Sequence, residues 1–327
     1  MEVKSSGIFE EILIKSEISS KKVSKVCIAE GLTKSGEKIN LILLKMYRKD
    51  MVVNHNHIWN ERNVLEYIRD CQTMKEDEKL ALPLIYDSLV LEEKETKITY
   101  ICIALNYIRG KTLDKYINNT SLSVDFLRKI FIQVAKVIGS LHKEGIIHRD
   151  IKCSNIIIES ETEKIKLIDM SLSCFVDTKK QRLSEFCGSF HTMAPEMICM
   201  QKPNYSIEYD WWSFGVLIYE MVFGIPPYGY HPEENKYLLK RINESPKSLS
   251  FPEPVIFMGD FIQGRKNREE TEDLIMKLLN KDESIRLGSN GDFKQVIEHP
   301  WFKSYHLMNF HEDSYFLENI DLINDEI

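Results

Sequence analysis

One short segment of the chain carries three side chains whose types and spacing could do chemistry. Residues 148 to 155 read His-Arg-Asp-Ile-Lys-Cys-Ser-Asn, which places Asp150, Lys152 and Asn155 in a single stretch. Together such side chains can take up the proton of a hydroxyl group, neutralise a phosphate and hold a divalent metal. The same letters also fit a polar turn between a helix and a strand, which any α+β protein can contain. The rest of the chain must decide between the two interpretations.

A second carboxylate follows closely. Residues 156 to 159 and 164 to 169 read as two short strands joined by an acidic turn. Asp169 ends the second of these strands, and Asn155 precedes the first. We therefore expect Asp150, Asn155 and Asp169 to converge where neighbouring strands end.

A buried carboxylate is expected earlier in the chain. Residues 57 to 68 have a helical pattern, in which Glu61 lies three residues after Ile58 and four before Leu65, on the apolar face. A buried Glu needs a partner. Lys45, the only cation inside the apolar run that ends at position 47, supplies one. Two surface charges on separate elements would be the alternative, and Glu61 fits it poorly.

The elements that must position these residues fall into two parts. Residues 38–47 and 98–104 are β-rich, and the helix at 57–68 separates them, whereas apolar residues recur at helical spacing from 124 to 142. Residues 70–97, which contain KEDEK and LEEKETK, read as an exposed loop and a hairpin turn. We predict an α+β fold with a small β-rich lobe, one main helix in it, a larger helical lobe and a cleft between them.

Composition excludes several classes of protein. The chain has 327 residues, 43% of them hydrophobic, a net charge of −7 and a pI of about 5.8. This gives a large core but no electrostatic footprint for nucleic acid or an anionic membrane. Seven scattered cysteines without a CxxC pair indicate neither a disulfide framework nor a zinc site, so we expect a reducing, intracellular compartment.

No targeting or membrane-spanning segment is expected. The N-terminal residues mix acidic and basic side chains among short apolar groups and lack the uninterrupted apolar region of a signal peptide. The most apolar stretch begins at Trp211, but it contains Glu220 and two prolines. It is better interpreted as a buried helix.

Motifs in a fixed order give the chain a family resemblance. They are LILLKMY at 41–47, NER at 60–62, HRDIKCSN at 148–155, LIDMS at 167–171, MAPE at 193–196 and DWWSFGVLIYEMVFGIPPY at 210–228. With these motifs in this order, the chain resembles the eukaryotic protein kinases. The Lys at the second position after Asp150 resembles the catalytic loop of the serine/threonine kinases. The run FCGSFHTMAPE, the double Trp, and RLG followed by HPWF resemble the AGC group, and within it the catalytic subunit of cAMP-dependent protein kinase, over roughly residues 8 to 303.

The resemblance implies a role for each motif residue. Asp150 would orient and deprotonate the substrate hydroxyl, Lys152 would contact the transferred phosphoryl group, and Asn155 with Asp169 would bind Mg²⁺. The predicted ATP-binding residues are Ile18, Val26, Leu43, Lys45, Glu61, Leu105, Asn106, Ile108, Ile157 and Ile168. The implied boundaries are 1–105 for the β-rich lobe, 106–112 for a hinge, 113–303 for the helical lobe and 304–327 for a short AGC-like tail.

Other residues would support the site. The resemblance implies that Glu196 pairs with Arg286 and that Asp210 anchors the catalytic loop through backbone donors. An activation segment would contain Ser184, Glu185 and Ser189. Glu185 stands where the family carries a phosphorylated Thr, so a permanent carboxylate could pair with Arg149 and with His57. Ser184 is a candidate phosphorylation site, and a loop Glu without a partner is the alternative for Glu185.

Three departures affect the expected nucleotide site. Residues 18–26 occupy the place of the glycine-rich loop, yet they hold Ser19, Lys21 and Ser24 where the family has Gly, and we expect these side chains to obstruct the tight fold of the loop. The added lysines at 21, 22 and 25 could supply positive charge or could simply be a solvated face. Leu43 stands where an Ala is usual and should crowd the nucleotide. Ser171 replaces the Gly after the magnesium-binding Asp.

We predict a Mg²⁺-dependent serine/threonine protein kinase that uses ATP. The expected partner is a protein substrate, with room for a regulatory subunit, and we expect a monomeric catalytic subunit without nucleic-acid or membrane partners, in the cytoplasm or the nucleus. A pseudokinase scaffold with weak or no ATP turnover is the alternative, because the glycine-rich loop is degenerate. A kinase of small molecules fits less well, since the resemblance implies a peptide-docking arrangement from MAPE to Arg286.

Overall fold

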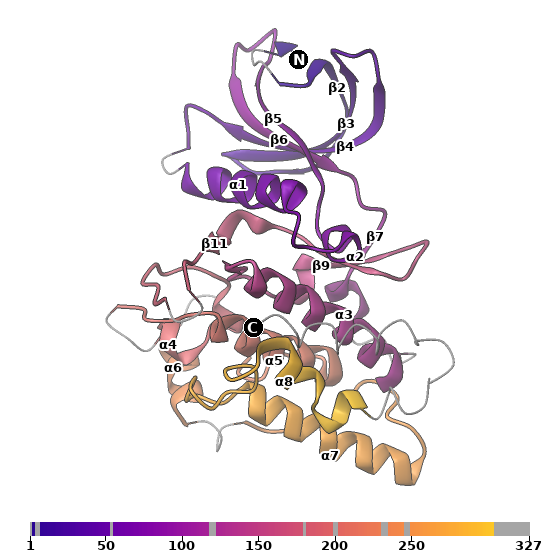
Figure 1. Cartoon of the computed structure of the whole chain (residues 1–327), viewed down its shortest axis with the longest axis vertical. Helices are drawn as coiled ribbons and strands as arrows, with labels where there is room; N and C mark the ends of the chain where they lie inside the picture. The colour runs from indigo at the N-terminus through magenta and orange to yellow at the C-terminus, as the bar shows by residue number, and fades with distance from the viewer. Residues whose placement is uncertain are drawn as a thin grey trace. The chain divides into compact units, whose positions relative to one another are not determined.

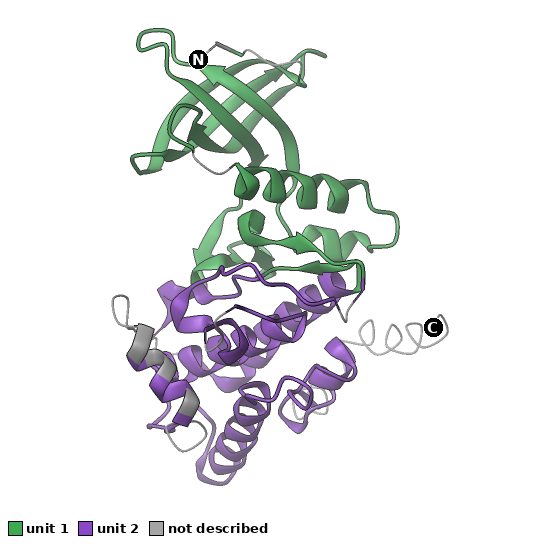
Figure 2. Cartoon of the chain, turned by 90° about the vertical axis from the view of Figure 1, so that its left-hand side faces the viewer, with its two compact units in different colours: residues 1–112, 143–148, 154–177 green, residues 113–142, 149–153, 178–327 purple. Residues whose placement is uncertain are grey.

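The computed structural model describes residues 2–3, 7–52, 55–117, 122–178, 181–198, 202–229, 235–244 and 249–303. The chain forms two compact units (Figure 2). The first unit comprises residues 1–112, 143–148 and 154–177, and the second comprises residues 113–142, 149–153 and 178–327. The residues around the predicted catalytic loop are therefore divided, with Asp150 in the second unit and Asn155 in the first.

A six-stranded antiparallel sheet is the largest sheet of the first unit among the described residues (Figure 1). Its order is β1-β5-β6-β4-β3-β2. The strands are β1 (Glu2–Val3), β2 (Phe9–Ser20), β3 (Ser24–Thr33), β4 (Lys38–Arg48), β5 (Ile85–Glu92) and β6 (Thr99–Asn106). The two β-rich runs recognised in the sequence correspond to β4 and β6, which pair with each other.

The two faces of this sheet differ. Along β4, Ile42, Leu44 and Met46 are fully buried in the sheet's apolar core. Since successive side chains of a strand point to opposite faces, Leu43 and Lys45 lie on the other face. The pairing register places Val26 of β3 beside Lys45. This second face therefore carries the residues predicted to bind a nucleotide.

The β2–β3 hairpin closes without glycine. The backbone N–H of Lys21 donates to the carbonyl oxygen of Ser24 over 2.8 Å, and Ser19 pairs with Val26. Within the described residues 7–52 only Gly36 has a positive φ, so the turn requires no left-handed residue. The expectation that Ser19, Lys21 and Ser24 obstruct the tight fold of the loop is wrong for its backbone.

A helix, a short helix and smaller strands complete the first unit. They are α1 (Asn56–Asp70), α2 (Glu76–Leu80), β7 (Gly110–Thr112), β8 (Ile146–Ile147), β9 (Ile156–Glu159), β10 (Ile165–Leu167) and β11 (Cys174–Phe175). Strands pair in the order β10-β9-β7, and β11 pairs with β8. The interpretation of residues 70–97 as an exposed loop and a hairpin turn is wrong for α2 and β5. Helix α2 is itself acidic, and the glutamates at 92, 93 and 95 make the buried Leu89 and Leu91 of β5 read as part of an exposed segment.

The second unit is helical. Its elements are α3 (Val124–Lys143, whose last residue belongs to the first unit), α4 (Pro195–Ile198), α5 (Glu208–Phe223), α6 (Asn235–Glu244), α7 (Phe261–Leu278) and α8 (Asp292–Ile297). Residues 209–223 of α5 are all buried, as the apolar stretch from Trp211 predicts. Gly215 lets α5 approach α7 closely, because a Cβ at this position would lie 2.8 Å from the Cβ of Leu278. Among the described residues, no helix has the length and apolar character needed to cross a membrane.

Candidate active site

An ion-pair network joins three elements of the first unit. Lys45 Nζ on β4 donates to Glu61 Oε1 on α1 over 2.5 Å and to Asp169 Oδ1, two residues after β10, over 3.1 Å. Glu61 is fully buried, as its place on the apolar face of the helix predicts. The pair expected between Lys45 and Glu61 is therefore present, and it includes Asp169 as well.

Burial and charge act in opposite directions on this network. Burial disfavours the Lys45 ammonium, but the charges of Glu61 and Asp169 outweigh it and raise the pKa of Lys45 well above its usual range. Burial also raises the pKa of Asp169, yet the Lys45 ammonium reverses this and holds that pKa well below its ordinary value. Burial raises the pKa of Glu61 against the opposing effect of Lys45. A charged Lys45 beside a charged Asp169 follows at neutral pH.

Asn155 and Asp169 flank one pair of strands. Ile156 of β9 pairs with Leu167 of β10, and the Ile168 N–H donates to the carbonyl oxygen of Asn155 over 2.8 Å. Asn155 is buried, whereas Asp169 is partly exposed and has a left-handed backbone with φ of 68°. The two predicted metal ligands therefore lie at the same end of the β9–β10 ladder.

Asp150 and Lys152 form a separate cluster in the second unit with Ser189. Lys152 Nζ donates to Asp150 Oδ2 over 2.6 Å and to Ser189 Oγ over 2.8 Å, and Ser189 Oγ donates to Asp150 Oδ1 over 2.7 Å. Asp150 is buried. The carboxylate is thus held from both sides at a fixed orientation. Its convergence with Asn155 and Asp169, which belong to the first unit, stays a prediction.

A buried triad fixes the backbone beside Asp150. Asp210 of α5 accepts the Arg149 N–H over 2.9 Å, and its other carboxylate oxygen lies 3.0 Å from His142 Nε2. The second ring nitrogen of His142 lies 2.9 Å from Asp292 Oδ1. Burial opposes protonation, but the carboxylates of Asp292 and Asp210 raise the pKa of His142 to about 9. Asp210 therefore anchors Arg149, whose left-handed φ of 67° needs such support.

Glu185 has a partner. Arg149 Nη1 lies 2.9 Å from Glu185 Oε2 and donates to Tyr205 Oη over 2.9 Å, while the Tyr205 hydroxyl donates to the Glu185 carbonyl oxygen over 3.0 Å. Arg149 is buried, whereas the Glu185 side chain is 49% exposed. The alternative of a loop Glu without a partner is therefore excluded. His57 belongs to the first unit, where its Nδ1 lies 3.3 Å from the carbonyl oxygen of Ser171.

A buried arginine ties α4 to the segment after α7. Arg286 Nη1 and Nη2 bind the two carboxylate oxygens of Glu196 at 2.7 and 2.9 Å. The guanidinium also lies 5.2 Å from the centre of the Trp212 ring. The pair expected between Glu196 and Arg286 is present, with the parallel geometry that makes such bonds strong. Ser184 is exposed.

The apolar candidates for nucleotide binding all belong to the first unit. In the sheet register Leu43 pairs with Ile28 on one side and Leu105 on the other, so these three share the face of Lys45. Ile18 is 53% exposed. The candidates outside that sheet face include Asn106, which ends β6 and whose side chain accepts the Leu84 N–H over 2.7 Å, together with Ile108, Ile157 and Ile168, which are partly buried.

Sequence reasoning missed two supporting residues. Tyr205 and His142 carry no motif that singles them out. Tyr205 lies in a polar segment before α5, and an isolated His inside an apolar helix pattern is typical of an ordinary core. The pattern of α3 could have given one signal: His142 follows directly after Leu141 at a fully buried position, where an imidazole requires polar partners.

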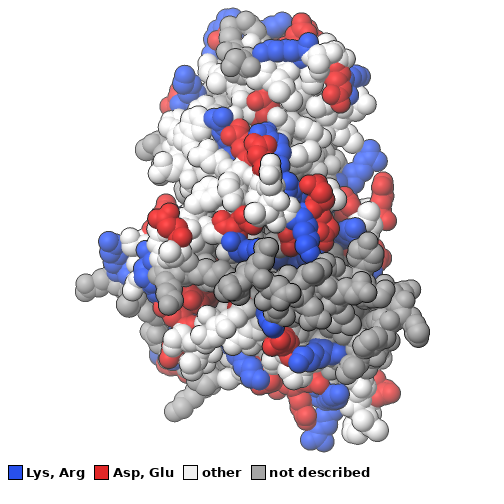
Figure 3. All heavy atoms as spheres, viewed as in Figure 1, with Lys and Arg blue, Asp and Glu red and all other residues white. Residues whose placement is uncertain are grey.

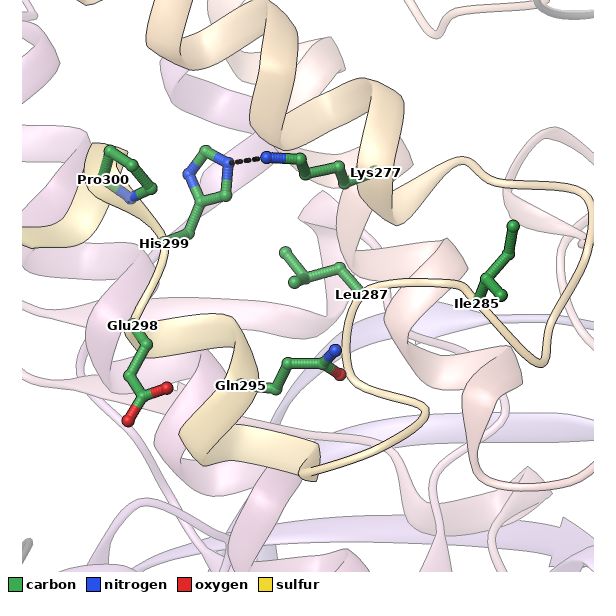
Figure 4. Close-up of a pocket in the computed structure, with 7 residues that line it drawn as sticks. All are labelled: Lys277, Ile285, Leu287, Gln295, Glu298, His299 and Pro300. Atoms are coloured by element: carbon green, nitrogen blue, oxygen red, sulfur yellow. Dashed lines mark hydrogen bonds between the residues drawn. The ribbon is translucent and has the colours of Figure 1, made fainter.

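One cavity lies apart from all these residues in the second unit. It measures about 370 Å³ and is lined by Lys277, Ile285, Leu287, Gln295, Glu298, His299 and Pro300 (Figure 4). Lys277 Nζ lies 3.5 Å from His299 Nε2, and both contact Asp273. None of the residues predicted for the active site lines it.

Comparison with known proteins identifies the family. The protein kinase domain matches residues 40–302, and the chain belongs to this family. The α+β kinase fold expected from the sequence is confirmed, with a β-sheet and helix in the N-terminal part and a helical C-terminal region. The match begins within β4, so the β2–β3 hairpin lies outside it.

Curated relatives agree with this assignment. The chain is 29% identical over 77% of its length to a probable serine/threonine-protein kinase of Dictyostelium discoideum. It is 28% identical over 76% of its length to a putative ribosomal protein S6 kinase alpha-2, and 28% identical over 81% to the serine/threonine-protein kinase sgk-1, both of Caenorhabditis elegans. The matched region covers 50%, 29% and 51% of these three relatives, respectively.

Proposed function

We propose that the chain transfers the γ-phosphate of ATP to serine or threonine hydroxyls of proteins. The observation that carries this proposal is the network of Lys45, Glu61 and Asp169. It holds an ammonium group beside a carboxylate that stays ionised, and β4, α1 and the end of β10 must all be in place to form it. A lysine positioned in this way can neutralise nucleotide phosphates.

The donor atoms near this network suit Mg²⁺. Asn155 offers an amide oxygen and Asp169 a carboxylate oxygen from the same end of the β9–β10 ladder, and hard oxygen ligands are those that Mg²⁺ prefers. A bound Mg²⁺ would neutralise charge that builds up on the phosphates. Asn155 and Asp169 would hold it, and the lowered pKa of Asp169 keeps its carboxylate available for binding.

Asp150 and Lys152 would act on the acceptor side. The Asp150 carboxylate can orient an acceptor hydroxyl and take up its proton, and Lys152 can contact the transferred phosphoryl group. Ser189 and Lys152 hold the carboxylate in one orientation. Such preorganisation is how positioning residues contribute to the rate.

The finer classification is an AGC-type serine/threonine kinase similar to the cAMP-dependent kinase. It is supported by the motifs around Ser189 and α5 and by relatives whose names include an S6 kinase and a serine/threonine-protein kinase. The Arg149–Glu185 pair supports an activation segment ordered without phosphorylation. The predicted tail at 304–327 lies outside the described residues.

Protein substrates are the expected partners, and a regulatory subunit is compatible with the proposal. Lysine and arginine side chains are interspersed with aspartate and glutamate side chains on the face drawn in Figure 3. Together with the net charge of −7, this supports a kinase without nucleic-acid or anionic-membrane partners.

A pseudokinase scaffold is the second candidate, and one observation favours it. Leu43 lies on the face of the sheet that carries Lys45, where a large side chain reduces the space for an adenine ring. Retention of Lys45, Asp150, Asn155 and Asp169 argues for the enzyme, because a scaffold has no chemical need for this set.

A phosphotransfer assay on a degenerate peptide library separates the two. With ATP and Mg²⁺, the wild-type protein should phosphorylate serine or threonine peptides, and Asp150→Asn should not. Wild-type activity no higher than that of the variant, with no thermal stabilisation of either by ATP and Mg²⁺, would identify a scaffold.

A further inference from the structure

The β2–β3 hairpin carries several lysines that the proposed mechanism has not used. Three of them can be distinguished by their surroundings. Lys15 Nζ pairs with Glu30 at 3.0 Å, and Lys25 Nζ lies 5.6 Å from the centre of the Tyr100 ring. The ammonium group of Lys21 has no carboxylate partner among the residues that the structure describes.

The register of the sheet shows which way these lysines face. Ser19 pairs with Val26, which pairs with Lys45, so these three residues lie on one face. Two residues farther along, Lys21 lies opposite Ser24, to which its N–H donates. Lys21 directly follows the last residue of β2. Its neighbour Ser24 is the first residue of β3 and shares a face with Val26 and Lys45, because alternate residues of a strand share a face, so the hydrogen bond to Ser24 puts Lys21 at the end of that face.

Lys25 faces the other way. It pairs with Met46 and Ser20, and Met46 is buried in the apolar core of the sheet. Tyr100, on which the Lys25 ammonium lies, belongs to the same core. Lys21 and Lys25, four positions apart in one hairpin, therefore lie on opposite faces of the sheet.

The distance suits a shared polyanion. Lys21 is two strands away from β4 in the sheet and two residues away from Lys45 along the strand direction. These two offsets together separate the Cα atoms of Lys21 and Lys45 by about 12 Å. Long, flexible lysine side chains can converge on one polyphosphate across such a distance, each as a point charge. The ammonium of Lys45 is held by Glu61 and Asp169, whereas that of Lys21 is available for a phosphate.

We infer that Lys21 binds the polyphosphate of a nucleoside triphosphate through its side chain, on the sheet face that carries Lys45. In a hairpin without glycine, side chains lie between the backbone N–H groups and a ligand, so these N–H groups cannot approach a phosphate closely. A side-chain cation supplies the positive charge in their place. This assignment rests on the proposed function, since it takes ATP to be the ligand of that face.

Binding measurements on three proteins test the assignment. The wild-type chain, Lys21→Gln and Lys25→Gln are titrated with ATP in the presence of Mg²⁺ and, separately, with adenosine, which lacks phosphates. Lys21→Gln should weaken ATP binding by about tenfold and leave adenosine binding unchanged, because one charge-assisted hydrogen bond is lost. Lys25→Gln removes the same charge from the opposite face of the hairpin and should bind both ligands as the wild type does. Lys21→Arg should restore most of the ATP affinity.

Three results would overturn the assignment: equal ATP affinity of Lys21→Gln and wild type, an equal loss in Lys25→Gln, or a wild type that binds ATP no better than adenosine. Phosphate transfer to peptides is measured on the same proteins. If the wild type binds ATP through Lys21 but transfers nothing, the proposed function fails and the assignment of Lys21 stands. If transfer occurs and Lys21→Gln binds ATP normally, only the assignment fails.

Discussion

At the scale of single residues, the site depends on charges that are held in place by other charges. Lys45 is stabilised as an ammonium by Glu61 on one side and Asp169 on the other. Glu61 is fully buried, so its own charge would be costly without Lys45. Lys45 therefore favours the ionised form of both carboxylates, and the two carboxylates favour its ammonium form.

Replacing Glu61 by Gln tests this dependence. The variant keeps the shape of the side chain but leaves Lys45 with Asp169 alone, and we expect kcat/KM for peptide phosphorylation to fall by about a hundredfold, with a loss of about 2 kcal/mol in the free energy of unfolding. Steady-state kinetics and urea unfolding measure the two effects.

Glu66→Gln is the matched control for this experiment. Glu66 lies on the same helix and pairs with Arg62 at 3.0 Å, but both side chains are about one-third exposed. We expect the free energy of unfolding to change by less than about 0.5 kcal/mol and kcat/KM to equal that of the wild type. A Glu61→Gln variant as active as Glu66→Gln would show that the network does not position Lys45 for catalysis.

The pair of Glu185 with Arg149 leads to a second prediction for single residues. Its pair with buried Arg149 orders the segment next to Ser189, but the Glu185 side chain is half exposed, so solvent screens the interaction. Glu185→Ala should lower the rate of phosphate transfer by about fivefold, as expected for a pair that contributes about 1 kcal/mol. Glu269→Ala, which removes an exposed carboxylate of α7 paired with Arg265, provides the control.

The proposal for Glu185 also has a thermal readout. A drop in melting temperature should accompany the lower rate, because Arg149 is left buried without that carboxylate. Unchanged phosphate transfer together with an unchanged melting temperature would refute the idea that Glu185 replaces a phosphate.

At the scale of elements, helix α3 is connected to α5 and α8 through His142. The ring lies between Asp210 and Asp292, and the Trp211 Nε1–H also donates to Asp292 Oδ1 over 3.0 Å. Asp210 in turn accepts the Arg149 N–H. The backbone orientation at Arg149, directly before Asp150, thus depends through Asp210 on the protonated imidazole of His142.

This arrangement predicts a pH dependence of stability. The pKa of His142 is raised to about 9 in the folded protein, above the unfolded value of about 6.5. The stabilisation from the protonated ring is therefore fully present below pH about 6.5 and is lost as the pH rises through about 9. Urea unfolding of the wild type and of His142→Gln should give a stability difference that is about 3 kcal/mol smaller at high pH than at pH 6. A difference independent of pH would mean that the ring is neutral.

Much of the fold follows from the sequence, and the exceptions have physical reasons. Apolar residues recur at helical spacing in α1 and α3, and α5 is one long apolar run, so these helices are recognisable. Strand β5 is not, because Asp87 and Ser88 interrupt its apolar residues and glutamates stand at 92, 93 and 95. Helix α2 is too short to show a period. The effect of the lost glycines also could not be predicted, because the backbone conformation of a turn depends on register and not only on residue type.

The candidate site shows the same division. Glu61 and Lys45 could be paired from the sequence because a carboxylate on an apolar helix face needs a cation. The contact of Ser189 with Asp150 and Lys152 could not, since these residues are far apart in the chain and no periodicity relates them. The partners of His142 were hidden for the same reason.

At the scale of the whole molecule, the residues proposed to bind the nucleotide and those proposed to act on the acceptor belong to two different units. All the predicted ATP-binding residues and both metal ligands belong to the first unit, whereas Asp150, Lys152 and the activation segment belong to the second. The proposed function therefore uses residues of both units, and the contribution of each unit can be tested by removing one carboxylate from it.

The fate of the γ-phosphate of ATP is the most direct test of this account. Labelled ATP and Mg²⁺ are incubated with serine and threonine peptides and the wild type, Asp150→Asn or Asp169→Asn, after circular dichroism has shown that all three are folded. The account predicts labelled peptide with the wild type and a loss of at least about a thousandfold with either variant. Label that stays in ATP with all three proteins, or appears equally in peptide with all three, would contradict it.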